Sequence, residues 1–167
     1  LCALTRLAAS VVLFVLSCPL FALFPADSLR ARSTENVKLI HSDVLYKNRM
    51  DARADVLVGH VRLYHDGMYL DCDSARFYKD ENTFNAYGNV KMMQGDTLTL
   101  TSDTLLYDGS MMQAHALGNA VLTHRNTQLT TSVIDYDRWE GVGFYPRHGV
   151  LVDEENVLNS DYGQYTP

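Results

Sequence analysis

A repeat of about thirty residues constrains the fold of this chain more than any other feature of its sequence. A small residue in an apolar run, followed a few positions later by an aromatic residue, recurs at Ser42, Cys72, Ser102, Ser132 and Ser160, with spacings of 30, 30, 30 and 28 residues. A glycine that opens an alternating run is a second marker, found at Gly59, Gly88 and Gly118, with a degraded copy at His148-Gly149. Two markers that keep one period predict similar supersecondary units packed side by side.

Within each unit the apolar residues fall on alternate positions, which is the period of a β-strand with one buried face. Asp66-Gly67 interrupts this alternation as a turn. We expect these side chains to face inward: Val61, Leu63, Met68, Leu70, Val90, Met92, Leu98 and Leu100. In the third unit Gln128, Thr130 and Ser132 stand at the expected inward positions, and Leu129 lies in the other phase. Either a bulge shifts the register there or the inner surface is more polar.

The chain divides into three regions by composition. Residues 37–167 lack a sustained helical period and are rich in β-branched and aromatic residues, so we predict an all-β repeat domain. Residues 27–36 are polar and are interpreted as a linker. In residues 1–26 an uncharged run, LAASVVLFVLSCPLFALF, follows Arg6. This predicts a hydrophobic helix that is either a cleaved signal peptide or a retained membrane anchor, and it indicates export.

Both ends of the sequence suggest a longer protein. The chain begins with Leu rather than Met and stops just after a strand-like pattern. We therefore expect it to be a fragment, truncated at its C-terminus.

The sequence carries no motif for catalysis or for a cofactor, so we expect a protein that is not an enzyme. Cys72 is the only cysteine after the apolar run, which excludes an internal disulfide there and predicts a small buried side chain. His60 and His65 have no cysteine partners at metal-binding spacing, so we expect no metal site. The formal net charge of −6 disfavours a nucleic-acid partner.

Three phrases of the repeat resemble the OstA-like family, which includes the periplasmic bridge LptA, the membrane-anchored LptC and the periplasmic domain of LptD. They are Ala86-Tyr87-Gly88-Asn89-Val90-Lys91-Met92, Gly95-Asp96-Thr97-Leu98-Thr99-Leu100-Thr101-Ser102-Asp103 and Ala116-Leu117-Gly118-Asn119-Ala120-Val121-Leu122. The resemblance covers residues 37–165 and is poorest in the third unit, where Ser132-Val133 replaces Ser-Asp. It implies an open β-jelly roll with two facing sheets of antiparallel strands.

The resemblance also implies a function. Family members shield the acyl chains of lipopolysaccharide in an apolar groove as they carry it across the periplasm of Gram-negative bacteria. The eight inward side chains named above then become candidates for lining the groove. Lipopolysaccharide or a related glycolipid, and similar jelly rolls paired edge to edge, become the expected partners. A retained anchor would indicate an LptC-like role, a cleaved signal an LptA-like role, and a further C-terminal barrel an LptD-like protein.

Other interpretations remain open on the residues alone. Any β-sandwich buries such an apolar stripe, so the pattern by itself favours a closed core over a groove. The alternative functions are a surface-exposed structural β-solenoid and a carbohydrate-binding β-sandwich. The second would use the aromatic residues around Trp139, which we otherwise expect to plug one end of the sandwich. An open apolar groove favours lipid transport, and a closed core favours the alternatives.

Overall fold

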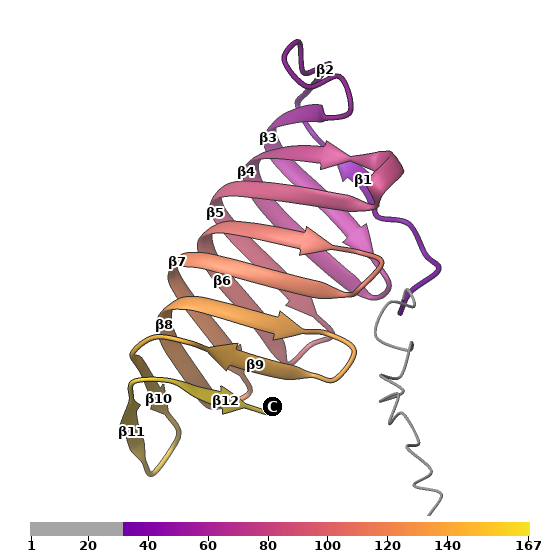
Figure 1. Cartoon of the computed structure of the whole chain (residues 1–167). Coiled ribbons are helices and arrows are strands. Elements are labelled where there is room, and N and C mark those ends of the chain that lie inside the picture. The colour runs from indigo at the N-terminus through magenta and orange to yellow at the C-terminus, as the bar shows by residue number, and fades with distance from the viewer. Residues whose placement is uncertain (1–31) are drawn as a thin grey trace, which may run out of the picture.

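The computed structural model describes residues 32–167, and in this part of the chain the regular structure consists of β-strands and one 3₁₀ turn (Figure 1). The strands are β1 (Lys38–His41), β2 (Val44–Lys47), β3 (Asp55–His65), β4 (Met68–Tyr78), β5 (Thr83–Gln94), β6 (Leu98–Asp108), β7 (Gln113–His124), β8 (Thr127–Asp137), β9 (Val142–Tyr145), β10 (Gly149–Val152), β11 (Val157–Ser160) and β12 (Gly163–Tyr165). A single 3₁₀ turn, η2 (Lys79–Glu81), joins β4 to β5. The all-β prediction is confirmed. The predicted signal or anchor (residues 1–26) lies outside the described residues, and within them no helix could cross a membrane.

All twelve strands belong to one antiparallel sheet, whose main path runs β1-β3-β4-β5-β6-β7-β8-β10-β11. The long strands β3 to β8 have 11 or 12 residues each, and their pairing register shifts about halfway along. The sheet folds over along this line, so the two halves of every long strand lie in two facing layers (Figure 1). The repeat predicted two or three short strands per unit. The structure instead has two long bent strands per unit. The two facing sheets that the resemblance implies are the two halves of a single sheet.

We call the two halves layer A and layer B. Layer A contains β1, β10, β11 and the segments 61–65, 68–72, 90–94, 98–102, 120–124 and 127–131. Layer B, which lies in front in Figure 1, contains β2, β9, β12 and the segments 55–58, 74–78, 83–87, 104–108, 113–117 and 133–137. The line where they meet is called the bend, and the opposite long side, formed by hairpin turns, is called the mouth.

Each glycine marker of the repeat lies at the bend. In β5, Gly88 and Asn89 have φ angles of 73° and 45°, so two successive residues adopt left-handed backbone and the strand turns from one layer into the other. The Asn89 amide donates a hydrogen bond to Asp73 Oδ2 of β4 at 2.8 Å. A Cβ atom on Gly88 would lie 2.4 Å from that same oxygen. Both the backbone and the neighbouring aspartate therefore require glycine here.

The same arrangement recurs in the neighbouring units. Asn119 of β7 donates to Asp103 Oδ2 of β6 at 2.8 Å. In the first unit His60 takes the asparagine position, and its Nδ1 lies 2.7 Å from Asp43 Oδ2. The two sequence markers thus meet at the bend. The glycine marker supplies the left-handed backbone, and the aspartate that follows the small residue of the other marker accepts the hydrogen bond. The pattern ends at β8, where Ser132 stands in place of an aspartate.

The third unit continues the apolar interior. Leu129 is fully buried, and Gln128 and Thr130 are exposed. Arg125-Asn126, the turn between β7 and β8, is one residue shorter than Gly95-Asp96-Thr97, the turn between β5 and β6. A shift of one residue exchanges the two faces of a strand. The shorter turn therefore accounts for the change of phase. Neither of the two explanations offered from the sequence, a bulge or a more polar inner surface, applies here.

Candidate functional site

The eight side chains predicted to face inward all lie on layer A and line the interior. None of them is more than 6% exposed, and all belong to one hydrophobic cluster. They are Val61, Leu63, Met68, Leu70, Val90, Met92, Leu98 and Leu100. Layer A therefore supplies one continuous aliphatic wall, extended through the third unit by Leu122 and Leu129.

Layer B supplies a facing wall that sequence reasoning missed. It consists of Leu57, Ala75, Phe77, Phe84, Ala86, Leu105, Tyr107, Ala114, Ala116, Ile134 and Tyr136. The alternation changes phase at the bend in β4, where the inward positions Cys72 and Ala75 are three residues apart. Ser102 and Leu105 of β6 show the same step. The two-residue alternation of buried side chains is therefore interrupted at the bend and does not continue from one layer into the other. The aromatic residue of the repeat marker belongs to this second wall.

Side-chain size along the walls follows the shape of a wedge. On layer B, Ala75 and Ala86 lie near the bend, and Phe77 and Phe84 lie toward the mouth. Phe84 stacks on Tyr107 with ring centroids 5.0 Å apart. Two layers that diverge from a bend leave more space with distance from it, so small residues fit close to the bend and rings fit near the mouth. In this structure the side chains of the two layers pack against one another in the interior.

The mouth is bridged by Arg138, from the turn between β8 and β9. Its side chain is buried and reaches across from layer B to layer A. The guanidinium donates to Gln94 Oε1 at 3.0 Å, to the Tyr107 hydroxyl at 2.6 Å and to the Asp66 carbonyl at 2.8 Å. Among the described strands none pairs with another across this side, so side chains join the layers here. At the bend the backbone of each long strand runs from one layer into the other.

A chain of hydrogen bonds continues from Arg138 to layer A. Tyr107 Oη lies 2.7 Å from His65 Nδ1, and His65 Nε2 lies 3.1 Å from the carbonyl oxygen of Glu35. These contacts are satisfied by a neutral His65 that accepts from Tyr107 and donates to Glu35. Burial of the ring lowers the pKa of His65, which favours this neutral form. Burial also raises the pKa of Tyr107 to about 12.

The segment 32–37 runs along the mouth and is called the strap. The Glu35 carbonyl accepts from Asn82 Nδ2 at 3.0 Å, and the Val37 amide donates to Asn82 Oδ1 at 2.7 Å. Arg32 forms an ion pair with Asp137, and its backbone amide donates to the Ser110 carbonyl at 2.7 Å. Part of the predicted linker is therefore a cover for the mouth, bound mainly to layer B.

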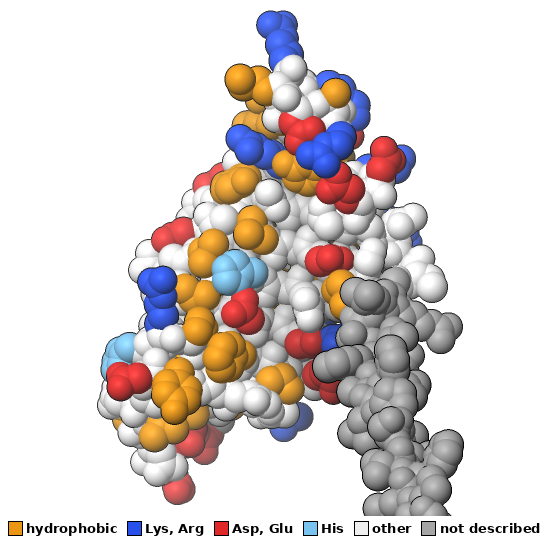
Figure 2. Space-filling view, viewed as in Figure 1, with side chains coloured by type: hydrophobic (Ala, Val, Ile, Leu, Met, Phe, Trp, Pro, Cys, Tyr) orange, Lys and Arg blue, Asp and Glu red, His pale blue; other side chains and the backbone are white. Residues whose placement is uncertain are grey.

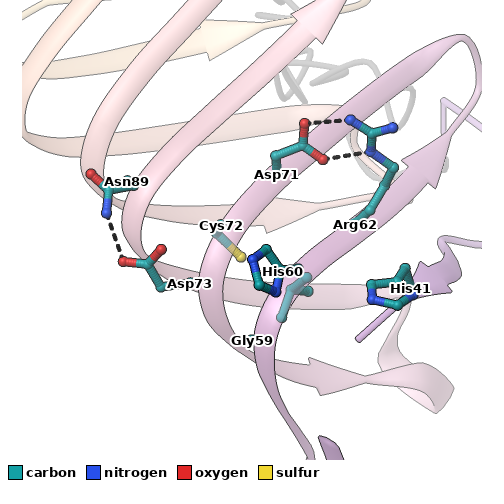
Figure 3. A pocket seen from close by; sticks show the side chains of 9 residues that line it. His41, Gly59, His60, Arg62, Asp71, Cys72, Asp73 and Asn89 are labelled. Carbon is teal, nitrogen blue, oxygen red and sulfur yellow. Dashed lines mark hydrogen bonds and ion pairs between the residues drawn. The ribbon is translucent and has the colours of Figure 1, made fainter. Parts of the chain in front are cut away.

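The outer surface carries a pocket and several exposed hydrophobic side chains. A pocket outside the bend lies between β3 and β4, where Arg62 forms two hydrogen bonds of 2.6 and 2.7 Å with Asp71 (Figure 3). The outer face of layer B carries scattered hydrophobic side chains, including Leu106 and Phe144, which are 37% and 44% exposed (Figure 2). In residues 32–167 no three potential ligands are arranged to hold a metal ion. Cys72 is buried, as predicted, and burial raises its pKa to about 12.

The aromatic cluster predicted around Trp139 is divided by the structure. Trp139 is 61% exposed on the turn between β8 and β9, and Phe144 points outward. Tyr136 and Tyr145 are buried in the interior. The expectation that this cluster plugs one end of the sandwich is therefore wrong for Trp139 and Phe144, which lie outside the interior. Its backbone amide binds Asp137 Oδ1 at 3.0 Å, which fixes the tight turn and leaves the indole outside.

Comparison with known proteins agrees with this geometry. The sequence model described as "OstA-like protein" matches residues 34–167. The structure is similar to that of LptH from Pseudomonas aeruginosa, described as the LptA-homologous periplasmic component of the lipopolysaccharide transport device. The TM-score is 0.54 with 14% sequence identity, over 62% of this chain and 76% of LptH, which shows a shared fold. A comparison with curated protein sequences found no match.

Proposed function

The chain belongs to the OstA-like protein family, and we propose that it is a periplasmic, non-enzymatic module that carries lipopolysaccharide or a related glycolipid during outer-membrane assembly. The acyl chains would lie between layers A and B and the sugars outside the mouth. The observation that supports this most strongly is the wedge itself. Its two walls are apolar, and at the mouth they are held together by side-chain contacts and by the strap.

The closed interior requires the layers to separate for a lipid to enter. Separation at the mouth breaks a few polar side-chain contacts and leaves the strand pairing within each layer intact. Each methylene of an acyl chain buried between the walls contributes about 0.8 kcal/mol. Several chains of ordinary length would therefore offset the loss of direct contact between the walls. Methionines such as Met68 and Met92 are flexible enough to adapt to mobile chains.

Site-specific photocrosslinking in cells tests the lipid position. The photoreactive residue replaces Leu70 or Leu100, both fully buried on layer A, or Thr99, which points away from the interior on the same strand as Leu100. We expect lipopolysaccharide adducts at Leu70 and Leu100 and none at Thr99. An exported, active protein that gives no adduct at either leucine would contradict the proposal.

The proposal extends to partner domains at the two ends of the wedge. Among the described residues, β1 and β2 form unpaired edges at one end, and β11 and β12 form them at the other. Interior-facing side chains there are half exposed, with Leu45 of β2 at 52% and Leu158 of β11 at 54%. Edges of this kind accept strands from another sheet. Docking of a similar jelly roll would pair the edges and continue the apolar interior from one domain into the next.

Sedimentation of the purified protein with the Leu45→Asp substitution tests this docking. We expect the substitution to reduce association between copies, because it places a charge on the surface that an incoming domain must cover. Leu106→Asp, on the outer face away from both ends, is the matched control. Equal behaviour of the two variants would contradict end-to-end docking.

A further inference from the structure

Among the residues that the structure describes, the charge of Arg138 has no partner of opposite sign at the mouth. Its side chain is buried, with the residue 5% exposed, yet all its hydrogen-bond acceptors are neutral groups. They are an amide oxygen, a hydroxyl, a backbone carbonyl and, at 3.4 Å, His65 Nδ1. Within residues 32–167 no carboxylate lies at ion-pair distance from it. The nearby Asp137 is bound to Arg32, and Asp66 offers its carbonyl oxygen while the residue itself is exposed. Buried guanidinium groups are ordinarily paired with an anion, because desolvation of an unpaired charge is costly.

The position of this cation coincides with the border of the apolar interior. Arg138 donates a hydrogen bond to the Tyr107 hydroxyl, and the ring of Tyr107 stacks on Phe84 inside the wedge. A lipid whose acyl chains lie between the walls would place its headgroup at this border, beside the guanidinium. The five N–H donors of arginine bind phosphate or carboxylate oxygens in pairs, and such bonds are stronger than bonds to neutral acceptors.

Resting on the function proposed above, we propose that Arg138 is the headgroup-binding residue of the mouth and recognises a phosphate group on the bound lipid. In the empty protein the guanidinium bridges the layers through Gln94, Tyr107 and Asp66. When lipid enters, the anionic group replaces these neutral acceptors. The same side chain thus closes the empty interior and selects an anionic lipid for the filled one.

Binding of two lipids to the purified full chain tests this assignment. The probes are a phosphorylated lipid A and the same lipid after enzymatic removal of its phosphates. We expect the wild type to prefer the phosphorylated form by about tenfold or more, the size expected for hydrogen bonds to a charged group. Arg138→Gln should remove most of this preference and change the Kd for the dephosphorylated lipid little. Arg138→Lys keeps the positive charge and should retain part of the preference.

Arg76→Gln is the matched control, because Arg76 is exposed on the outer face of layer B. This variant should keep the full preference. Thermal unfolding and binding of an uncharged apolar dye show that each variant is folded and keeps its interior. If Arg138→Gln does not fold, the wild-type preference and its retention in Arg138→Lys still decide the assignment.

Four results would overturn the inference. Equal wild-type affinity for the two lipids, with the dye still bound, rejects Arg138 as a headgroup site and leaves the lipid-carrier function standing. Equal loss of both lipids in Arg138→Gln shows that the residue only holds the layers together. Displacement of phosphorylated lipid by inorganic phosphate alone shows a phosphate site independent of lipid. If neither lipid nor the dye binds the wild type, the proposed function falls together with the inference.

Discussion

The bend and the mouth are the two long sides of one wedge, and they are closed by different kinds of interaction. At the bend the backbone of each long strand passes from one layer to the other, fixed by left-handed residues and by Asn-Asp hydrogen bonds such as Asn89–Asp73. At the mouth the layers are joined by side chains, chiefly Arg138, Tyr107 and His65, and by the strap. We therefore propose that the mouth is the gate that opens for a lipid and that the bend is the hinge. Separation at the mouth breaks side-chain and strap contacts and leaves the backbone of the bent strands continuous.

The largest effect on stability is expected from a methyl group at the bend. Gly88→Ala places Cβ 2.4 Å from Asp73 Oδ2 in addition to the cost of left-handed backbone, so we expect a loss of about 3 kcal/mol in the free energy of unfolding. Gly67→Ala is the control, because Gly67 has a similar φ of 75° and no atom within 4 Å of its Cβ position. It should lose only about 1 kcal/mol. Denaturant unfolding measures both, and equal losses would show that the aspartate contact does not define the bend.

A smaller loss of stability is expected when a hydroxyl group is removed at the mouth. Tyr107→Phe keeps the ring on Phe84 and removes the oxygen that joins Arg138 to His65. We expect a loss of about 1–2 kcal/mol in the free energy of unfolding, together with faster uptake of an apolar dye. Tyr136→Phe is the control, since Tyr136 is also buried on layer B and its hydroxyl does not take part in this chain of contacts. If Tyr107→Phe leaves dye uptake unchanged, the gate does not depend on the Tyr107 hydroxyl.

Two histidines should make the free energy of unfolding depend on pH in opposite directions, with effects smaller than those of the substitutions above. Hydrogen bonding to Asp43 at the bend raises the pKa of His60, and burial at the mouth lowers the pKa of His65. His60 therefore contributes stability below its unfolded pKa of about 6.5, and this contribution is lost as pH rises through its folded pKa. For His65 the unfolded chain takes up the proton first, so stability falls as pH drops below about 6.5 toward the folded pKa.

Proton NMR titration of the histidine rings checks these directions one residue at a time. The His60 resonance should titrate above 6.5 and the His65 resonance below it. The variants His60→Gln and His65→Gln assign the two signals. A His65 that titrates at or above the value of an exposed histidine would mean that the mouth is open and hydrated in the empty protein.

Local sequence patterns predicted one wall of the site and not the other. The alternation from Val61 to Leu63 and from Met68 to Leu70 identified layer A, because period two holds on each side of a turn. Layer B was missed because the phase changes between Cys72 and Ala75, where Asp73 alone lies opposite the two residues Gly59 and His60 of β3. The Gly-Asn marker was visible as a repeat, but its contact with aspartate depends on strand pairing.

The mouth could not be predicted from the sequence for a different reason. Glu35, His65, Tyr107 and Arg138 are 30 or more residues apart from one to the next, and no local spacing relates them. Tyr107 was visible only as the aromatic residue of a repeat marker. These residues meet because the sheet folds over, so their chemistry emerges from the tertiary structure alone.

Distances between spin-label pairs test the hinge and gate most directly. One pair, at Asp96 and Gln113, spans the mouth from the β5–β6 turn of layer A to the start of β7 in layer B. The second pair, at Lys91 and Leu106, lies closer to the bend with one label on each layer. Double electron–electron resonance with and without lipid A measures both. We expect lipid to lengthen the distance across the mouth and to leave the distance near the bend almost unchanged. Lipid binding with no change across the mouth, or with an equal change at both pairs, would contradict this proposal.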